Sequence, residues 1–168
     1  GVRMTISLDA NSNVRAVTDA TNRRATYTWD ANKLLTSTVD GLGQRVTYSY
    51  ATLANQTKVI KSVRDPIGGR FTFVFGTNNR ITAVVDQTNR RATLVWDASG
   101  NRIATVDALG NRTSYAYNTT GLLKRAQEPL GQITTLVYGT NGQPIAYVDP
   151  LSNRTTFAYN ASGQTIRV

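Results

Sequence analysis

The sequence predicts an all-β protein, a long and curled antiparallel sheet made of tandem units of about 21 residues. Three observations support this prediction. An aromatic residue recurs at a nearly constant interval, an acid that opens a turn follows it eleven residues later, and β-prone stretches of alternating polarity lie between the turns. The residues that open the units are Leu8, Trp29, Tyr50, Phe75, Trp96, Tyr117, Tyr138 and Tyr159. We therefore expect residues 1–168 to form a single array of about eight repeats.

Other positions keep the same spacing. Five residues beyond the turn acid stands an arginine, except at Ile133, and seven residues beyond it stands Ser or Thr. The turn acids are Asp19, Asp40, Asp65, Asp86, Asp107, Glu128 and Asp149. The arginines are Arg24, Arg45, Arg70, Arg91, Arg112 and Arg154, and the hydroxyl residues are Thr26, Thr47, Thr72, Thr93, Ser114, Thr135 and Thr156.

The first unit illustrates the elements in order. Apolar Val2, Met4, Ile6 and Leu8 alternate with polar residues, which is typical of a half-buried strand. A turn begins at Asp9, because Asp and Asn side chains bond nearby backbone amides and tolerate left-handed conformations. Residues 14–18 form the next expected strand, residues 19–22 the second turn, and residues 24–29 the strand that ends on Trp29.

Every later unit repeats this strand–turn–strand–turn order. Short turns favour antiparallel pairing of consecutive strands, so we expect a meander of roughly sixteen strands, two per unit. In the second strand of a unit, Tyr48 and Tyr50 share one face, and Arg45, Thr47 and Ser49 share the other. The first strand is more variable, and the sequence leaves its register open.

The third unit is four residues longer than the others. The additional residues predict a longer loop around Leu53 to Lys58 in place of a tight turn. Surface insertions are usually neutral, although loops on repeats can carry function.

Composition limits the class of protein. The chain has 168 residues, 40% of them hydrophobic and 17% charged, which predicts an ordered domain with a core. It has no apolar run near the roughly 20 residues of a membrane helix, so we expect no membrane insertion. Because the first unit is only partly marked and the last ends within a strand, we expect the chain to be a piece of a longer repeat protein.

The formal net charge of +9 permits an anionic partner such as nucleic acid, an anionic glycan or an acidic protein. The basic residues are spread over the whole length, however, which disfavours nucleic acid and favours a role within the repeat itself.

The residues that usually carry catalysis are missing or belong to the repeat. The chain has no histidine and no cysteine, and every acid occupies one of two recurring turn positions. Those acids are expected to accept backbone hydrogen bonds or to pair with the repeat arginines. Each turn has one acid, which disfavours a calcium site, and the glycines occur singly, without a phosphate-binding loop. We therefore predict no enzyme activity, no catalytic or cofactor-binding residues, no metal site and no cofactor.

The aromatic residues have two interpretations. A stripe of Tyr and Trp can stack against sugars or bases, and it can equally form the core of a repeat protein. Phe73, Leu94 and Leu136 occupy equivalent places, and these side chains suit packing better than polar recognition. The core is therefore the favoured interpretation.

The unit "WDASGNRIATVDALGNRTSYAY", which begins at Trp96, resembles the RHS/YD-repeat family, with Trp96 in the place of the Tyr. The pattern recurs in "YGTNGQPIAYVDPLSNRTTFAY" from Tyr138, where Gly139 replaces the Asp and Ser152 the turn Gly. The resemblance covers essentially the whole chain and is weakest in the third unit.

The resemblance implies an open segment of a spiral β-shell within a larger bacterial protein that is secreted or displayed on the cell surface. In polymorphic toxins and insecticidal toxin complexes of this family, the shell encloses a C-terminal toxin, and teneurins have a similar shell that takes part in adhesion. The implied partners are the neighbouring repeats and an enclosed toxin domain. A module that binds anionic glycan or protein is the alternative, and an isolated piece is expected to curl or to self-associate because its edges and one face are uncovered.

Overall fold

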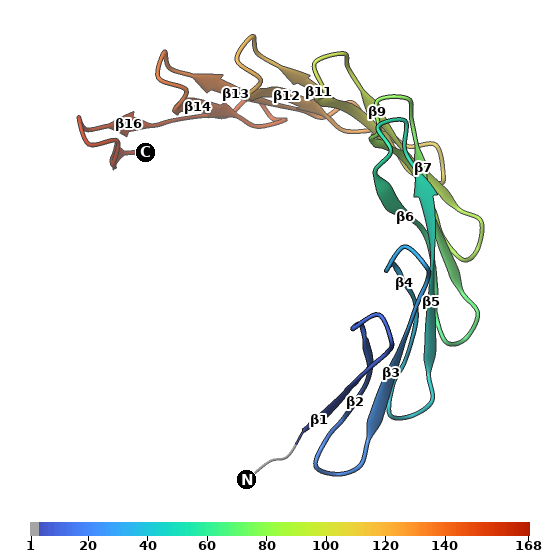
Figure 1. Ribbon diagram of the computed structural model, residues 1–168. Helices are drawn as coiled ribbons and strands as arrows, with labels where there is room; N and C mark the ends of the chain where they lie inside the picture. The colour runs from blue at the N-terminus through green and yellow to red at the C-terminus, as the bar shows by residue number, and fades with distance from the viewer. Residues whose placement is uncertain (1–3) are drawn as a thin grey trace. The chain divides into compact units, whose positions relative to one another are not determined.

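The computed structural model describes residues 4–168 and confirms the predicted fold class. Fifteen antiparallel strands follow one another in chain order in one sheet, from β1 to β15, and β16 and β17 form a separate hairpin (Figure 1). The expected strand at Met4 to Leu8 appears as β1, and the part of that expectation at Val2 lies outside the described residues. Within residues 4–168 no helix is long and apolar enough to cross a membrane.

The strands are short and their order is that of the predicted units. Their bounds are β1 Thr5–Leu8, β2 Val14–Thr18, β3 Arg24–Trp29, β4 Leu35–Val39, β5 Arg45–Thr52, β6 Lys58–Arg64, β7 Arg70–Phe75, β8 Ile81–Val85, β9 Arg91–Trp96, β10 Arg102–Val106, β11 Arg112–Tyr117, β12 Leu123–Gln127, β13 Ile133–Tyr138, β14 Pro144–Val148, β15 Arg154–Thr156, β16 Ala158–Tyr159 and β17 Thr165–Arg167.

The same compact turn joins consecutive strands along the described chain. At Asp107 the backbone amide donates to the Asn111 carbonyl at 3.0 Å, and the Gly110 amide donates to the Asp107 carbonyl at 3.1 Å. The fourth residue of the turn has a positive φ, as at Gly110 (88°) and Asn22 (62°). This is the hairpin in which a type I turn is followed by a left-handed residue. Gly and Asn reach this conformation most readily and hold the fourth place in most of the turns, although Lys33 and Gln56 hold it as well.

A β-bulge in the first strand of each unit settles the register that the sequence left open. In β4, Ser37 pairs with Thr28 and Leu35 pairs with Trp29, so Thr36 is an additional residue without a cross-strand partner of its own. The Thr36 hydroxyl donates to the Thr28 carbonyl at 3.0 Å. The equivalent additional residues are Arg15, Lys61, Thr82, Ile103, Lys124, Ile145 and Ile166. Because a bulge adds one residue, the apolar position of this strand does not follow simple alternation.

The prediction of a longer loop in the third unit is wrong. The four additional residues lengthen the two strands instead, adding the pairs Ala51–Val59 and Thr52–Lys58 to the β5–β6 hairpin. The turn at its end is the ordinary one, in which the Leu53 amide donates to the Thr57 carbonyl at 2.9 Å. Extending a hairpin by equal numbers on both strands preserves its register, so the insertion leaves the turn chemistry unchanged.

The aromatic residues do not form the buried core that the sequence analysis favoured. Among the described residues no large side chain is fully buried, and the aromatic residues that open the units are only half-buried. The buried residues are small and recur once per unit in the first strand. They are Ala16, Ser37, Ser62, Ala83, Ala104 and Ala146, which we call the small-residue column, and Arg125 takes this place in its unit. A single sheet layer explains this pattern, because within residues 4–168 the strands β1 to β15 all belong to one sheet and there is no second large sheet or helix to cover a face of it.

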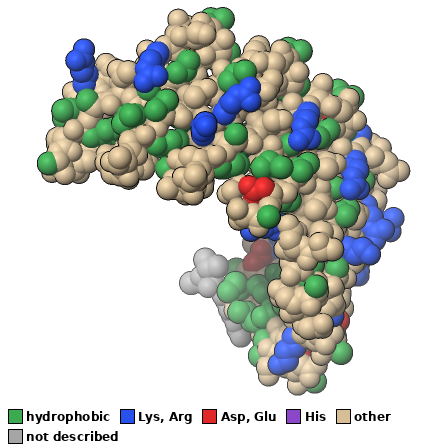
Figure 2. All heavy atoms as spheres, turned by 90° about the horizontal axis from the view of Figure 1, so that it is seen from above, with side chains coloured by type: hydrophobic (Ala, Val, Ile, Leu, Met, Phe, Trp, Pro, Cys, Tyr) green, Lys and Arg blue, Asp and Glu red, His purple; other side chains and the backbone are tan. Residues whose placement is uncertain are grey.

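The chain divides into two compact units, Gly1–Arg91 and Ala92–Val168. The pattern of turns, bulges and small residues is the same in each of them. On the face shown in Figure 2, Lys and Arg side chains are dispersed and hydrophobic side chains lie scattered among polar ones.

Candidate functional site: turn carboxylates, arginine face and aromatic face

The turn aspartates are bonded to the backbone of their own turns. In the turn at Asp107, carboxylate Oδ1 accepts from the amides of Leu109 and Asn111, both at 2.9 Å. Oδ2 accepts from the Asn111 side-chain amide at 2.8 Å. Paired backbone bonds of this kind are also made by Asp9, Asp19, Asp30, Asp40, Asp65, Asp86 and Asp149. The prediction that these acids accept backbone hydrogen bonds is confirmed.

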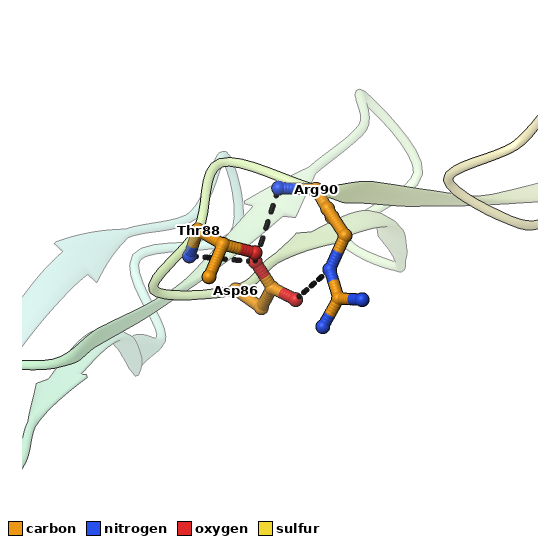
Figure 3. A network of polar contacts seen from close by, with 3 residues as sticks. All are labelled: Asp86, Thr88 and Arg90. Carbon is orange, nitrogen blue, oxygen red and sulfur yellow. Dashed lines mark hydrogen bonds and ion pairs between the residues drawn. The ribbon is translucent and has the colours of Figure 1, made fainter.

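These hydrogen bonds hold the carboxylates in the ionised form. The hydroxyl of Thr88, followed by backbone amides and the Arg90 side chain, lowers the pKa of Asp86 to about 2 (Figure 3). The side-chain amides of Asn101 and Asn111 likewise lower the pKa of Asp97 and Asp107. A general acid or base works best with a pKa near the working pH, so carboxylates shifted in this direction are poorly suited to proton transfer.

Ion pairing does not follow the repeat arginines. The ion pair within residues 4–168 joins Arg90 Nε to Asp86 Oδ2 at 2.9 Å, and Arg90 stands one place before the arginine of the series. Its side chain is 69% exposed, so the pair contributes little to stability. In the same part of the chain, no group of three or more acidic, His or Cys side chains could hold a metal ion.

The repeat arginines lie on the face of the sheet that carries the small-residue column, which we call the arginine face. Arg45 Nη1 donates to the Ser37 hydroxyl at 2.9 Å, and Arg70 Nε donates to the Ser62 hydroxyl at 3.2 Å. In each case the arginine reaches across to the buried serine of the preceding strand. Arg112 Nε bonds instead to Ser114 of its own strand at 3.2 Å. These arginines therefore cover small residues, a contact that the sequence did not reveal.

The other repeat arginines differ from these three. Arg24, Arg91 and Arg154 are exposed and make no side-chain hydrogen bond or ion pair within the described residues. All six repeat arginines are exposed, and they differ in that Arg45, Arg70 and Arg112 make a side-chain hydrogen bond within residues 4–168 whereas the other three do not.

The aromatic residues that open the units make a recurring polar contact that sequence reasoning missed. The side-chain OH or NH donates to the backbone carbonyl of the residue fifteen places earlier, at the start of the preceding strand. The pairs are Trp29–Val14, Tyr50–Leu35, Tyr117–Arg102, Tyr138–Leu123 and Tyr159–Pro144, at 2.7 to 3.0 Å. Burial raises the pKa of the Tyr50 hydroxyl, which keeps this donor protonated. The constant separation of fifteen residues between donor and acceptor in the sequence could have revealed this contact.

A shallow hollow lies beside the extended β5–β6 hairpin. Leu53, Lys61, Phe73 and Phe75 are among its lining residues, and the Ala54 amide donates to Asn79 Oδ1 at 3.2 Å next to it. The hollow has no acidic side chain in its lining and brings together no set of groups suited to catalysis.

Comparison with known proteins gives a consistent picture. The model of the RHS repeat matches residues 9–45 and 96–133. No curated protein matches the chain. The crystal structure of TcdB2-TccC3-Cdc42 is similar over 96% of this chain, with a TM-score of 0.70 and 14% identity. The structure of TcdB2-TccC3-TEV is similar over 96%, with a TM-score of 0.67 and 15% identity.

A third structure, the Photorhabdus luminescens Tc holotoxin pore with a TccC3 mutation, is similar over 97% of this chain, with a TM-score of 0.56 and 15% identity. The chain spans only 10% to 11% of the length of these three chains. At such low identities the likeness shows a shared fold. Together with the repeat matches over residues 9–45 and 96–133, it confirms the resemblance to the RHS/YD-repeat family that was stated from the sequence.

Proposed function

We propose that the chain is a non-catalytic wall segment of a β-shell, within a larger secreted bacterial protein whose shell encloses a C-terminal toxin. The observation that carries the proposal is the single-layer sheet, in which no large side chain of the described residues is fully buried. A wall needs two accessible faces and a uniform thickness, and a regular meander of short strands provides both. The structural similarity over 96% of the chain to TcdB2-TccC3-Cdc42 supports the same role.

The polar chemistry supports a structural role as well. The turn aspartates are bonded within their turns, and among the described residues that are not exposed no buried side-chain nitrogen or oxygen lacks a hydrogen-bond partner. In an active site, some polar side chains usually have no partner within the protein and are free to bind the substrate. In this chain the buried polar side chains are hydrogen-bonded within the fold.

A chimaera would test the proposal. The structurally matched tenth of the TcdB2-TccC3 chain would be replaced by residues 4–168, and limited proteolysis would follow the C-terminal region of TccC3. We expect the C-terminal region to be cleaved no faster in the chimaera than in the unmodified TcdB2-TccC3 chain. A chimaera that folds and yet exposes this region to protease would contradict the proposal. A chimaera with an unrelated β-rich insert of equal length provides the control.

The exposed repeat arginines that make no side-chain hydrogen bond favour a second candidate function, the binding of an anionic glycan. Arg24, Arg91 and Arg154 present guanidinium groups to solvent on the arginine face. Guanidinium groups suit bidentate binding of sulfate and carboxylate groups. This function is compatible with a wall segment if the arginine face lies outward.

Heparin binding across a salt series would test this second candidate. If it is correct, replacing Arg24, Arg91 and Arg154 by Ala abolishes saturable binding and leaves the Tm unchanged. Replacing Arg45, Arg70 and Arg112 serves as the matched control and is expected to lower the Tm, because two of these residues bond to buried serines. Binding that disappears at moderate salt with every variant alike would reflect only the net charge.

A further inference from the structure

A row of leucines lies at the tips of the second turns of the unit formed by residues 92–168. Leu109, Leu130 and Leu151 occupy the third place of their turns, and they are 87%, 87% and 82% exposed. In the other unit the same place holds Leu42 and Ile67, which are also highly exposed. Large apolar side chains with this exposure are ordinary when scattered, but a regular row of them indicates an interaction surface.

The three leucines lie along one edge of the sheet. Their turns join β10 to β11, β12 to β13 and β14 to β15. Successive turns are therefore two strands apart, which is about 9–10 Å along the edge. The opposite edge has polar residues at the same place of its turns, namely Ser99, Thr120 and Asn141. We call the edge with Leu109, Leu130 and Leu151 the leucine edge.

The turn itself does not require leucine. The third residue contributes its backbone amide, which donates to Oδ1 of the turn acid, as Leu109 does to Asp107 at 2.9 Å. Thr21 and Thr88 occupy the same place in turns with the same backbone bonds. The exposed side chains of the leucines therefore add nothing to the turn that threonine does not provide.

The charges along this edge restrict the kind of partner. Its three turns and the arginines that follow them carry the acids Asp107, Glu128 and Asp149 and the bases Arg112 and Arg154. The edge is thus nearly balanced in a chain whose net charge is +9. An anionic membrane or polyanion is only weakly attracted to such an edge. A protein surface that combines apolar side chains with charges of both signs is complementary to it.

We propose that the leucine edge binds the leucine edge of a second copy of this chain. Three leucines spaced by two strands are complementary to a surface with the same spacing, and a copy of the edge has that spacing. Pairing about a twofold axis places Leu130, the central leucine, near the axis and sets the acids of one edge beside the arginines of the other. This interface is independent of what the full-length protein encloses.

The oligomeric state of the purified chain tests the proposal. Analytical ultracentrifugation over a range of concentrations is expected to show a monomer–dimer equilibrium. The triple variant Leu109→Thr, Leu130→Thr and Leu151→Thr is expected to weaken dimerisation at least about tenfold. Its matched control is Ile103→Thr, Ile145→Thr and Ile166→Thr, since Thr36 and Thr82 hold the equivalent bulge position in this chain. The control is expected to dimerise like the wild type, with circular dichroism confirming that both variants fold.

A cross-link tests the geometry separately. The chain has no cysteine, so Leu130→Cys introduces a single thiol. Mild oxidation is expected to give a disulfide-linked dimer from this variant and not from Thr120→Cys, which lies on the opposite edge. A wild-type chain that stays monomeric up to its solubility limit would overturn the proposal. So would equal dimerisation of the leucine variant, or leucine-dependent binding to lipid vesicles without dimers.

Discussion

The hydroxyl of Tyr138 donates a 2.8 Å hydrogen bond to the backbone carbonyl of Leu123, fifteen residues earlier in the chain. Leu123 is the first residue of β12, and Tyr138 is the last residue of β13. The side chain thus holds the start of one strand against the end of the next, beside the bulge. Trp29, Tyr50, Tyr117 and Tyr159 make the same contact in their own units.

Replacing Tyr138 by Phe is expected to lower the free energy of unfolding by about 0.5–1.5 kcal/mol, because the Leu123 carbonyl loses its side-chain donor. Urea denaturation followed by circular dichroism measures the change. Tyr48→Phe is the matched control, because the Tyr48 side chain makes no hydrogen bond within the described residues. Equal effects of the two substitutions would show that the contact is not stabilising.

In the small-residue column, we expect the stability of the fold to depend on the size of the side chain. Ala146 is fully buried and pairs with Val137, and replacing it by Leu is expected to cost about 1–3 kcal/mol through overpacking. In the equivalent place Arg125 is accommodated because it pairs with the small residue Ala116. Adding Val137→Ala to Ala146→Leu should therefore recover much of the lost stability. Thermal unfolding of the single and double variants measures the coupling, and purely additive effects would contradict it.

The lowered pKa values of the turn carboxylates predict that acid lowers the stability of the fold. The folded-state pKa of Asp86 is lowered to about 2 from 3.8, and the pKa values of Asp9, Asp19, Asp97, Asp107 and Asp149 are lowered as well. A lowered pKa contributes stability above the unfolded value, and this stability is lost as pH falls through the folded value. The Tm should therefore be steady above about pH 5 and fall between about pH 4 and pH 2. A Tm that is constant over this interval would contradict the prediction.

We expect that asparagine can take the place of aspartate in these turns. Asn118 Oδ1 accepts from the amides of Thr120 and Leu122 at 3.1 and 2.8 Å, which reproduces the contacts of a turn aspartate. We expect Asp97→Ala to lower the Tm and Asp97→Asn to restore most of the loss, because only the second variant keeps an acceptor. If both variants melt alike, the carboxylate charge rather than its hydrogen bonds stabilises the turn.

The extended hairpin should tolerate a matched deletion. Removing Ala51, Thr52, Lys58 and Val59 deletes two complete cross-strand pairs and restores the common length of the unit. This variant is expected to fold with the β-sheet spectrum of the wild type. Removing only Ala51 and Thr52 should destabilise the chain, because the turn at Leu53 would then no longer close between paired strands. Equal loss of structure in both variants would show that the extension itself is needed.

The sequence was sufficient to predict the strands and turns because their signals are local. Asp107 and Gly110 define a turn by their own chemistry, and Tyr117 marks the end of a strand at a fixed distance. The bulge was not predictable, because Ile103 and Thr36 have nothing in common except their position opposite a regular strand. The absence of a layered core was not predictable either, since alternation along a strand gives the same pattern in one layer or two.

The candidate site was predictable only in part. The structural role of the acids follows from their recurrence, and the backbone bonds of Asp107 confirm it. The contact between Arg45 and Ser37 depends on the register between two strands, which spacing alone does not reveal. The small-residue column was missed because isolated Ala and Ser residues give no signal until cross-strand neighbours are known.

Every strand of the fifteen-stranded sheet pairs with strands adjacent in the sequence. Native contacts are therefore closed over short loops, and topologies of this kind fold quickly because little chain entropy is lost before the contacts form. A strand can join the sheet as soon as its predecessor is in place, without waiting for a distant partner. The sheet is therefore expected to form stepwise, one strand after another along the chain.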